Sequence, residues 1–379
     1  MEQIVPETAR SNLITPERLR DHRFCSRFHA NRRVLGIWPK HAPDAFGGRP
    51  AVIDALLAGF RAAQALPPLD ARGPAMVLHG AQNYLGSGHG RQRHAMEVSR
   101  DLAYVVCVEA VLRQSNFLGT HAILGVDVPF SFPHLNPDTG RVSPIWLRAG
   151  MIHLAVRNAA TNQIRVVQFR TTDAPIDFGA IYWRNLALDT SISQFILGAD
   201  VVFGGGVDKA IHAVIRKTAL RAYSATQKSE IKYRQRKTAE ASWSETDERL
   251  LYKGTRLREE GATEYYDRIL ESMNGNPSGT FAMTPVARRE EAIVEHLRDS
   301  WATSQIMREE QANGWFPKNA DSCHSRGECP YFGACSNTVS LENDSRFQHL
   351  GNVHPELPAD FAVEREEIID PIVKEPARG

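Results

Sequence analysis

The chain lacks the features of several protein classes. Its 379 residues contain no apolar run near the ~20 residues of a membrane helix, and residues 1–20 have no apolar signal-peptide core. The formal net charge is +1, so any nucleic-acid site must be a local basic surface. Cysteine is scarce, at five residues, an odd number. We therefore expect a soluble, cytoplasmic protein without membrane attachment, in which structural disulfides do not form.

Helical patterns dominate the first third of the chain. Thr15 followed by Pro16 predicts the start of a helix, which is expected to carry Cys25 among several arginines. Residues 50–116 are also predicted to be mostly helical, with a looser glycine-rich stretch at 86–90.

From residue 121 the pattern becomes that of strands. Residues 121–132 alternate like a strand, and the turn sequence at 136–140 is followed by two further segments rich in Val and Ile. They predict an antiparallel meander of three strands. Residues 184–203 then predict an amphipathic helix, and residues 208–220 a returning strand. A sheet flanked by helices indicates an α/β fold.

Residues 216–237 carry eight basic side chains against one acid, Glu230. Such a segment is either a solvated face or a phosphate-contacting surface, with Tyr223 and Tyr233 able to stack on bases. The candidate nucleic-acid contacts in it are Arg216, Lys217, Arg221, Lys228, Lys232 and Arg234. A long charged helix is predicted over 286–313.

Four of the five cysteines form the clearest pattern. Cys323, Cys329 and Cys335 are spaced six apart in a loop with glycines and a proline, whereas Cys107 lies in an apolar run and is predicted to be a buried side chain. Cys25 is the natural fourth thiol, because nearby arginines would stabilise a thiolate. Four thiolates indicate either an iron–sulfur cluster or a zinc ion, and His324 or His29 could complete a zinc site.

These segments together resemble the RecB-like branch of the PD-(D/E)XK nuclease superfamily, in particular its iron–sulfur members from phages and prophages, which are related to CRISPR-associated exonucleases. The sequence FCSRF at 24–28 and the cysteines at 323–335 match the family's split cysteine arrangement. Residues 148–158 resemble its G-x-I-D strand, residues 165–172 its E-x-K-T strand, and residues 183–199 its Q-x-x-x-Y helix. The resemblance implies a 4Fe–4S cluster held by Cys25, Cys323, Cys329 and Cys335.

Several positions depart from the family's catalytic pattern. His153 replaces its aspartate, Gln168 its glutamate and Arg170 its lysine, while Asp127 remains as an acid on the lead-in strand. Ser191 and Phe195 stand at the glutamine and tyrosine positions, and the family's N-terminal histidine has no counterpart near Ala51. The family cleaves DNA with Mg²⁺ or Mn²⁺ held by carboxylates. Each substitution weakens that chemistry, because a neutral or cationic side chain does not attract a hard cation.

The resemblance thus implies a restriction-endonuclease-like α/β core, a mixed central sheet flanked by helices, with the N- and C-terminal segments joined at a four-cysteine cluster. The predicted division is a helical region at 1–120, the core at 121–240, a helical region with three cysteines at 241–340 and a poorly ordered tail at 341–379. The expected function is DNA binding with weak or lost phosphodiesterase activity, with a helicase, nuclease or recombination protein as a possible partner. Two alternatives are an active nuclease that uses Mg²⁺ or Mn²⁺ at Asp127, His153 and Gln168, and a scaffold that does not bind nucleic acid.

Overall fold

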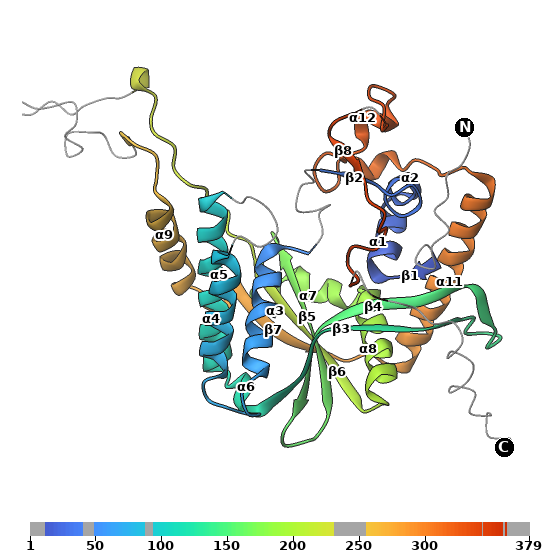
Figure 1. Cartoon of the computed structure of the whole chain (residues 1–379), viewed down its shortest axis with the longest axis horizontal. Coiled ribbons are helices and arrows are strands. Elements are labelled where there is room, and N and C mark those ends of the chain that lie inside the picture. Colours follow the sequence, from blue (N-terminus) through green and yellow to red (C-terminus); the bar gives the residue numbers. More distant parts are fainter. Residues whose placement is uncertain are drawn as a thin grey trace, which may run out of the picture.

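A mixed six-stranded sheet runs through the middle of the molecule in the computed structural model (Figure 1). The structure describes residues 12–40, 49–87, 94–230, 255–342, 344–358 and 361. The strand order is β1–β4–β5–β6–β7, and β3 also pairs with β4. The strands are β1 (Leu13–Ile14), β3 (His121–Leu135), β4 (Val142–Asn158), β5 (Ile164–Thr172), β6 (Val207–Arg216) and β7 (Phe281–Val286).

The predicted three-strand meander is confirmed. β3 pairs antiparallel with β4, and β4 pairs antiparallel with β5. The first turn closes at Gly140, whose φ of +67° lies in the left-handed region that glycine enters without strain. The returning strand β6 lies parallel to β5, so the chain crosses over the sheet between them.

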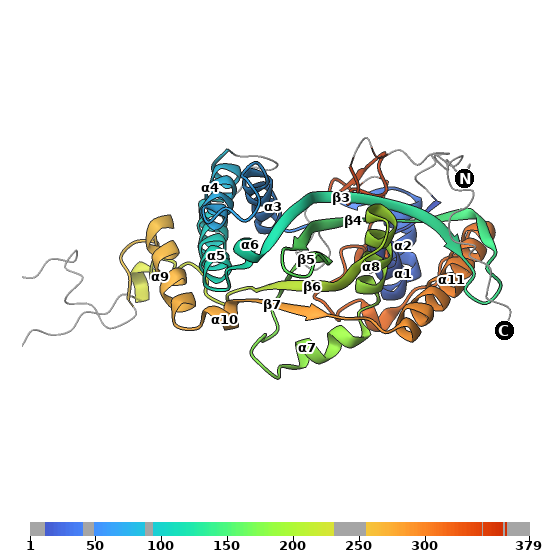
Figure 2. The same ribbon diagram turned by 90° about the horizontal axis from the view of Figure 1, so that it is seen from below.

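Helices cover both faces of the sheet, as Figure 2 shows from below, and the predicted α/β class with a mixed central sheet is therefore correct. One face packs against α3 (Ala51–Gln64) and α5 (Ala95–Gln114), on which α4 (Gly73–Gly86) and α9 (Ala262–Asn274) pack in turn. The other face packs against α8 (Thr190–Phe203) through a separate buried apolar cluster. The short helices are α6 (Phe117–Thr120), α7 (Ile181–Asn185) and α10 (Pro277–Thr280).

Two predicted helices differ in detail from the observed ones. The segment expected as one helix from residue 184 breaks after a 3₁₀ turn, and α8 starts anew because the Asp189 side chain accepts a hydrogen bond from the Ser191 N–H at 2.9 Å. The N-terminal helix α1 (Pro16–Phe24) begins with Thr15 as its N-cap, as predicted, but ends before Cys25. Cys25 has extended backbone angles at the break between α1 and α2 (Ser26–His29).

Segments from both ends of the chain gather beside α1 (Figure 1). The long helix α11 (Glu290–Asn313) confirms the prediction for that region. It leads into a loop with a 3₁₀ turn (Ala320–Ser322) and helix α12 (Phe332–Cys335). Strand β2 (Ile37–Pro39), which follows α2 and a π-helical turn (Ala30–Val34), pairs antiparallel with β8 (Phe347–His349). Residues some 300 positions apart therefore share one small sheet.

The segment from residue 341 was expected to be a poorly ordered tail, and for residues 344–358 this expectation is wrong. Besides β8, the side chains of Val353, His354 and Leu357 are buried. Arg33, which is itself buried, donates hydrogen bonds to the Val353 carbonyl at 2.9 Å and to the Glu356 carboxylate at 2.8 Å. A composition rich in proline and glutamate predicts disorder, but the buried arginines of the N-terminal segment need acidic partners, and this segment supplies one.

The sheet takes strands from three of the regions proposed from the sequence. β1 comes from 1–120, β3 to β6 come from 121–240, and β7 comes from 241–340. The pattern of residues 281–286 did not predict β7, an edge strand with a proline. Among the described residues, no single helix is long and apolar enough to cross a membrane, although the bent pair of α7 with its 3₁₀ turn and α8 passes by length and composition.

Candidate functional site

Four cysteines line one cavity of about 170 Å³, the cysteine cavity. Cys25 stands at the break between α1 and α2, Cys323 follows the 3₁₀ turn, and Cys335 is the last residue of α12. Cys329 lies between the latter two and is 6 % exposed. The N-terminal cysteine and the three C-terminal ones thus line the same cavity. Cys107 is buried on α5, as predicted, and does not line this cavity.

Hydrogen bonds fasten the loop of residues 314–335, here called the cysteine loop, to the end of α1 and the start of α2. The Asn319 N–H donates to Cys25 Sγ at 3.4 Å, and the Asn319 side chain donates to the Phe24 carbonyl at 3.1 Å. Arg27 donates from its backbone to the Pro317 carbonyl at 3.1 Å. The loop is therefore held against α1 by hydrogen bonds that require no bound group.

Burial raises the pKa of the three C-terminal thiols. Burial first, and Cys25 second, raise the pKa of Cys323; burial also raises the pKa of Cys329, to about 11, and the pKa of Cys335. Binding of a metal at such thiols must displace protons. Within the described part of the chain, no three His, Cys, Asp or Glu side chains converge closely enough to hold a metal ion.

The two histidines considered as zinc ligands have other neighbours. His29 is buried, and its Nε2 atom accepts a hydrogen bond from Arg18 Nε at 3.1 Å. The His324 ring packs against Phe332, with 5.2 Å between ring centroids. Neither histidine is among the described residues that line the cysteine cavity.

A second feature is a gap in the strand pairing along one edge of β4. β1 pairs with β4 as far as Arg148, and β5 pairs with it from Leu154 onward, which leaves residues 149–153 between these partners. Gln194 of α8 spans part of the gap. Its Nε2 atom donates to the Ala149 carbonyl at 2.9 Å and to the carbonyl of the last β1 residue at 2.8 Å. A side chain thus replaces strand pairing there.

His153 and Gln168 lie at the same gap, opposite each other in the continued register of β4 and β5. The Phe169 N–H donates to His153 Nδ1 at 3.0 Å, and Gln168 Nε2 donates to the Met151 carbonyl at 3.1 Å. Burial, then Arg49 and Arg170, keeps the pKa of His153 well below its usual range. Both side chains therefore satisfy main-chain groups that the separating strands leave unpaired, and His153 is neutral.

Asp127, the remaining acid, faces His153 across β3 and β4. Its φ of +50° is unusual for a residue within a strand. Both carboxylate oxygens accept hydrogen bonds from arginines, one from Arg49 and the other from Arg49 and Arg61. The carboxylate is thus already neutralised by two guanidinium groups.

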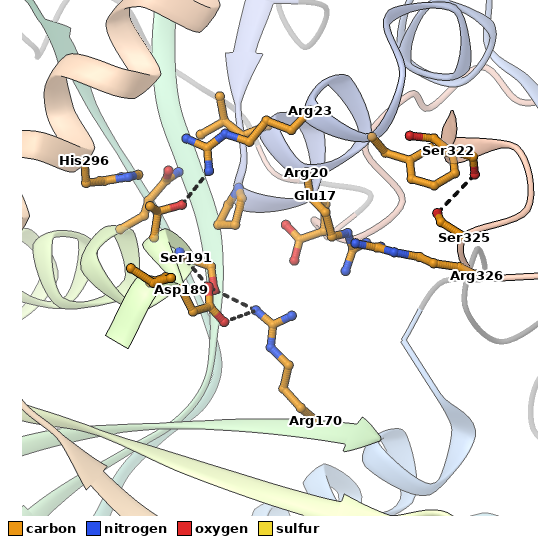
Figure 3. Close-up of a pocket in the computed structure, with 16 residues that line it drawn as sticks. Glu17, Arg20, Arg23, Arg170, Asp189, Ser191, His296, Ser322, Ser325 and Arg326 are labelled. Carbon is orange, nitrogen blue, oxygen red and sulfur yellow. Dashed lines mark hydrogen bonds and ion pairs between the residues drawn. The ribbon is translucent and has the colours of Figure 1, made fainter. Parts of the chain in front are cut away.

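Two larger cavities meet beside this edge and share Glu17, Arg20 and Arg170. The first, the arginine cavity, has a volume of about 570 Å³ and lies between α1, the start of α8 and the cysteine loop (Figure 3). The second, the sheet cavity, has a volume of about 430 Å³ and includes His153 and Gln168 in its wall. The expected catalytic positions other than Asp127 therefore line a cavity, to which they bring one arginine, one histidine and one glutamine. The carboxylates in its wall are those of Glu17, Asp54 and Glu356.

Arg170 points toward the start of α8 in Figure 3. It donates to Ser191 Oγ at 2.7 Å and lies 3.9 Å from the Asp189 carboxylate. Burial works against ionisation of Asp189, but Arg170 and the hydrogen bonds from Ser191 hold its pKa below the usual range. Burial, followed by Glu356, raises the pKa of Glu17.

Within the described residues, the basic segment that begins at Arg216 does not line these cavities. Arg216 and Lys217 lie 3.9 Å and 3.2 Å from the carboxylates of Asp177 and Asp173. Arg221 is exposed, and the chain runs past α5 toward α9, on the opposite side of the molecule from α1 (Figures 1 and 2). The Lys228 side chain and residues Lys232, Tyr233 and Arg234 lie outside the described parts of the structure.

Sequence reasoning missed three residues at the site. Gln194 lies one helical turn after Ser191, the position at which the family has its glutamine. The sequence feature that could have identified it is a single glutamine within an otherwise apolar helix. Glu17 was read as part of a helix start, and Arg20 as a neighbour of Cys25. Their place between two cavities follows from the packing of α1 on the sheet edge, which no local pattern encodes.

No family model matches this chain, and no curated protein matches it either.

Replacing His153 by alanine is expected to reduce the free energy of unfolding by about 1–3 kcal/mol, because the Phe169 N–H loses its acceptor. Denaturant unfolding measures this loss, and His79→Ala, at an exposed position on α4, is the control. A metal-ligand role for His153 would instead show as stabilisation of the unmodified protein by Mn²⁺ that the variant lacks.

Proposed function

We propose that this chain is a nuclease-fold protein that binds DNA and has little or no phosphodiesterase activity. The observation that carries the proposal is the meeting of two arginine-lined cavities at the edge of β4, where the family would hold a catalytic metal. Guanidinium groups attract phosphate and present several donors to its oxygens.

The proposed loss of cleavage rests on what each side chain at the edge of β4 already does. A hard cation needs free oxygen ligands. The Asp127 carboxylate is held by two arginines, and Gln168, whose Nε2 atom donates to a carbonyl, offers only a neutral amide oxygen in place of a carboxylate. His153 Nδ1 accepts a hydrogen bond, so a neutral ring carries its proton on Nε2 and has no free lone pair there. The family's lysine position holds Arg170, and a guanidinium group is not a proton-transferring base.

The cysteine cavity supports the second part of the proposal, an iron–sulfur cluster held by Cys25, Cys323, Cys329 and Cys335. Four thiols surround one cavity with an apolar lining, which includes Phe24, Phe28 and Tyr331. A polynuclear cluster is wider than a single ion, so thiols can reach it from the walls of a cavity without meeting at one point. When bound, the group supplies four metal–thiolate bonds that link the two ends of the chain. A visible absorption spectrum with iron and zinc analysis distinguishes it from zinc.

DNA binding is tested by fluorescence anisotropy with single- and double-stranded oligonucleotides at several salt concentrations. We expect binding that weakens steeply with salt, and no cleavage with Mg²⁺ or Mn²⁺. Arg170→Gln is expected to weaken binding about tenfold and to reduce the salt slope by about one, because one phosphate contact is lost. Arg72→Gln, which removes an exposed arginine paired with Asp70, is the matched control.

Two results would refute this proposal in different ways. Metal-dependent DNA cleavage that disappears in His153→Ala or Gln168→Ala would identify an active nuclease with divergent ligands. Absence of binding even at low salt would identify a scaffold that does not contact nucleic acid.

A further inference from the structure

We propose that the arginine cavity binds a phosphomonoester, and that in DNA it holds the terminal phosphate of a strand. This inference rests on the proposed DNA binding and names the part of the ligand that the site recognises. The site is the whole arginine cavity, whose walls are α1, the start of α8 and the cysteine loop, and it extends beyond the edge of β4.

Charge is the first argument. Arg20, Arg23, Arg170 and Arg326 line the cavity together with two carboxylates, those of Glu17 and Asp189, which leaves a formal charge of +2. His296, in the same wall, adds none, because burial and then Arg148 hold its pKa well below the usual range. A phosphomonoester carries a charge of about −1.5 to −2 near neutral pH, whereas a backbone diester carries one negative charge.

Two of the four arginines in this wall donate hydrogen bonds to hydroxyl groups. Arg23 donates to Thr190 Oγ1 at 2.8 Å, and Arg170 donates to Ser191 Oγ at 2.7 Å. The carboxylates nearest to these two guanidinium groups among the described residues, those of Asp299 and Asp189, lie 3.9 Å away. Each of these guanidinium groups thus has its closest contact with a neutral hydroxyl and only a longer ion pair with a carboxylate, so both can also donate to an anion.

The size of the arginine cavity and the placement of its arginines favour binding of a strand end over binding of a continuous strand. A volume of about 570 Å³ is that of a small-molecule site and would hold one nucleotide. Its wall comes from separate parts of the chain that face each other in Figure 3: Arg23 lies on α1, Arg170 on β5, and Arg326 in the cysteine loop. Three of the arginines, Arg20, Arg23 and Arg326, are exposed, so a ligand can approach them from solvent.

The test compares oligonucleotides of one sequence with a 5′-phosphate, a 3′-phosphate or hydroxyl groups at both ends. We expect one phosphorylated end to bind at least tenfold more tightly than the hydroxyl form. Arg23→Gln and Arg326→Gln are expected to remove this preference, and Arg72→Gln to retain it. Glu17→Gln is expected to strengthen binding of the phosphorylated end, because it removes a negative charge from the cavity. Circular dichroism confirms that each variant is folded.

The outcomes separate this inference from the proposed function. Equal binding of all three oligonucleotides would overturn end recognition while DNA binding stands. No binding of any of them would overturn both. A free nucleoside monophosphate that competes as strongly as the phosphorylated strand would support the phosphomonoester site but assign it to a free nucleotide, and would overturn the strand-end assignment.

Discussion

Cys329→Ser is expected to give a colourless protein that is poorly soluble and unfolds at a much lower temperature than the unmodified protein. Cys25 and Cys323 are 298 positions apart, and a shared cluster closes that loop. Without that closure the unfolded chain gains conformational entropy, which lowers the free energy of unfolding by an amount on the order of 5 kcal/mol, a large part of the usual stability of a domain. Visible absorption, iron content and thermal unfolding measure the three effects, and Cys25→Ser is expected to behave in the same way.

Cys107→Ser is the matched control, because Cys107 is also buried but lies on α5 and outside the cysteine cavity. It is expected to keep the colour and the iron content. A Cys329→Ser protein with unchanged solubility and unfolding temperature would show that the thiols share no structural cluster. Zinc in place of iron in the unmodified protein would keep the link between the chain ends but change its chemistry.

Acidification from about pH 7 to pH 5 is expected to unfold the protein or to remove most of its stability. Three buried histidines have strongly lowered pKa values. Burial and Arg148 lower the pKa of His134 to about 3, and burial lowers the pKa of His212 and of His354 to about 4. The unfolded chain has the ordinary histidine pKa of 6.5.

The direction in which stability changes with pH follows from proton uptake by the unfolded chain. Below pH 6.5 the unfolded chain binds protons that the folded protein excludes, so stability is present above this pKa and is lost as the pH falls toward the folded values of about 3 to 4. For each histidine, the free energy of unfolding at about pH 5 is then roughly 2 kcal/mol lower than at neutral pH. Denaturant unfolding at a series of pH values measures the slope.

His212→Gln is expected to reduce the slope of the free energy of unfolding against pH by the contribution of one histidine, because the glutamine does not titrate. Its side chain keeps a group that can bond to the Tyr182 hydroxyl, which lies 2.7 Å from His212 Nε2. The exposed His79→Ala variant should keep the original slope. A stability that does not change between about pH 7 and pH 5 would contradict the buried, neutral state of these histidines.

Local sequence patterns predicted much of the secondary structure, for physical reasons that act over a few residues. Thr15 and Pro16 start α1 because a threonine oxygen caps a free N–H and proline needs none there. Alternation in residues 121–132 and the turn ending at Gly140 predicted the meander, because strand faces and left-handed turns depend on neighbouring residues. The basis for considering residues 153, 168 and 170 together was a resemblance, not a local pattern.

Tertiary structure decided the rest, because it depends on contacts between distant residues. Packing made Glu356 a partner of the buried Arg33, and so ordered a segment whose composition predicts disorder. The separation of β4 from β5 turned His153 and Gln168 into hydrogen-bonding partners of the main chain, and the docking of α1 on that edge placed Arg20 in the walls of the same two cavities as Arg170. The sequence by itself determined which side chains were available, whereas their role depends on which main-chain groups and charges the fold leaves unpaired around them.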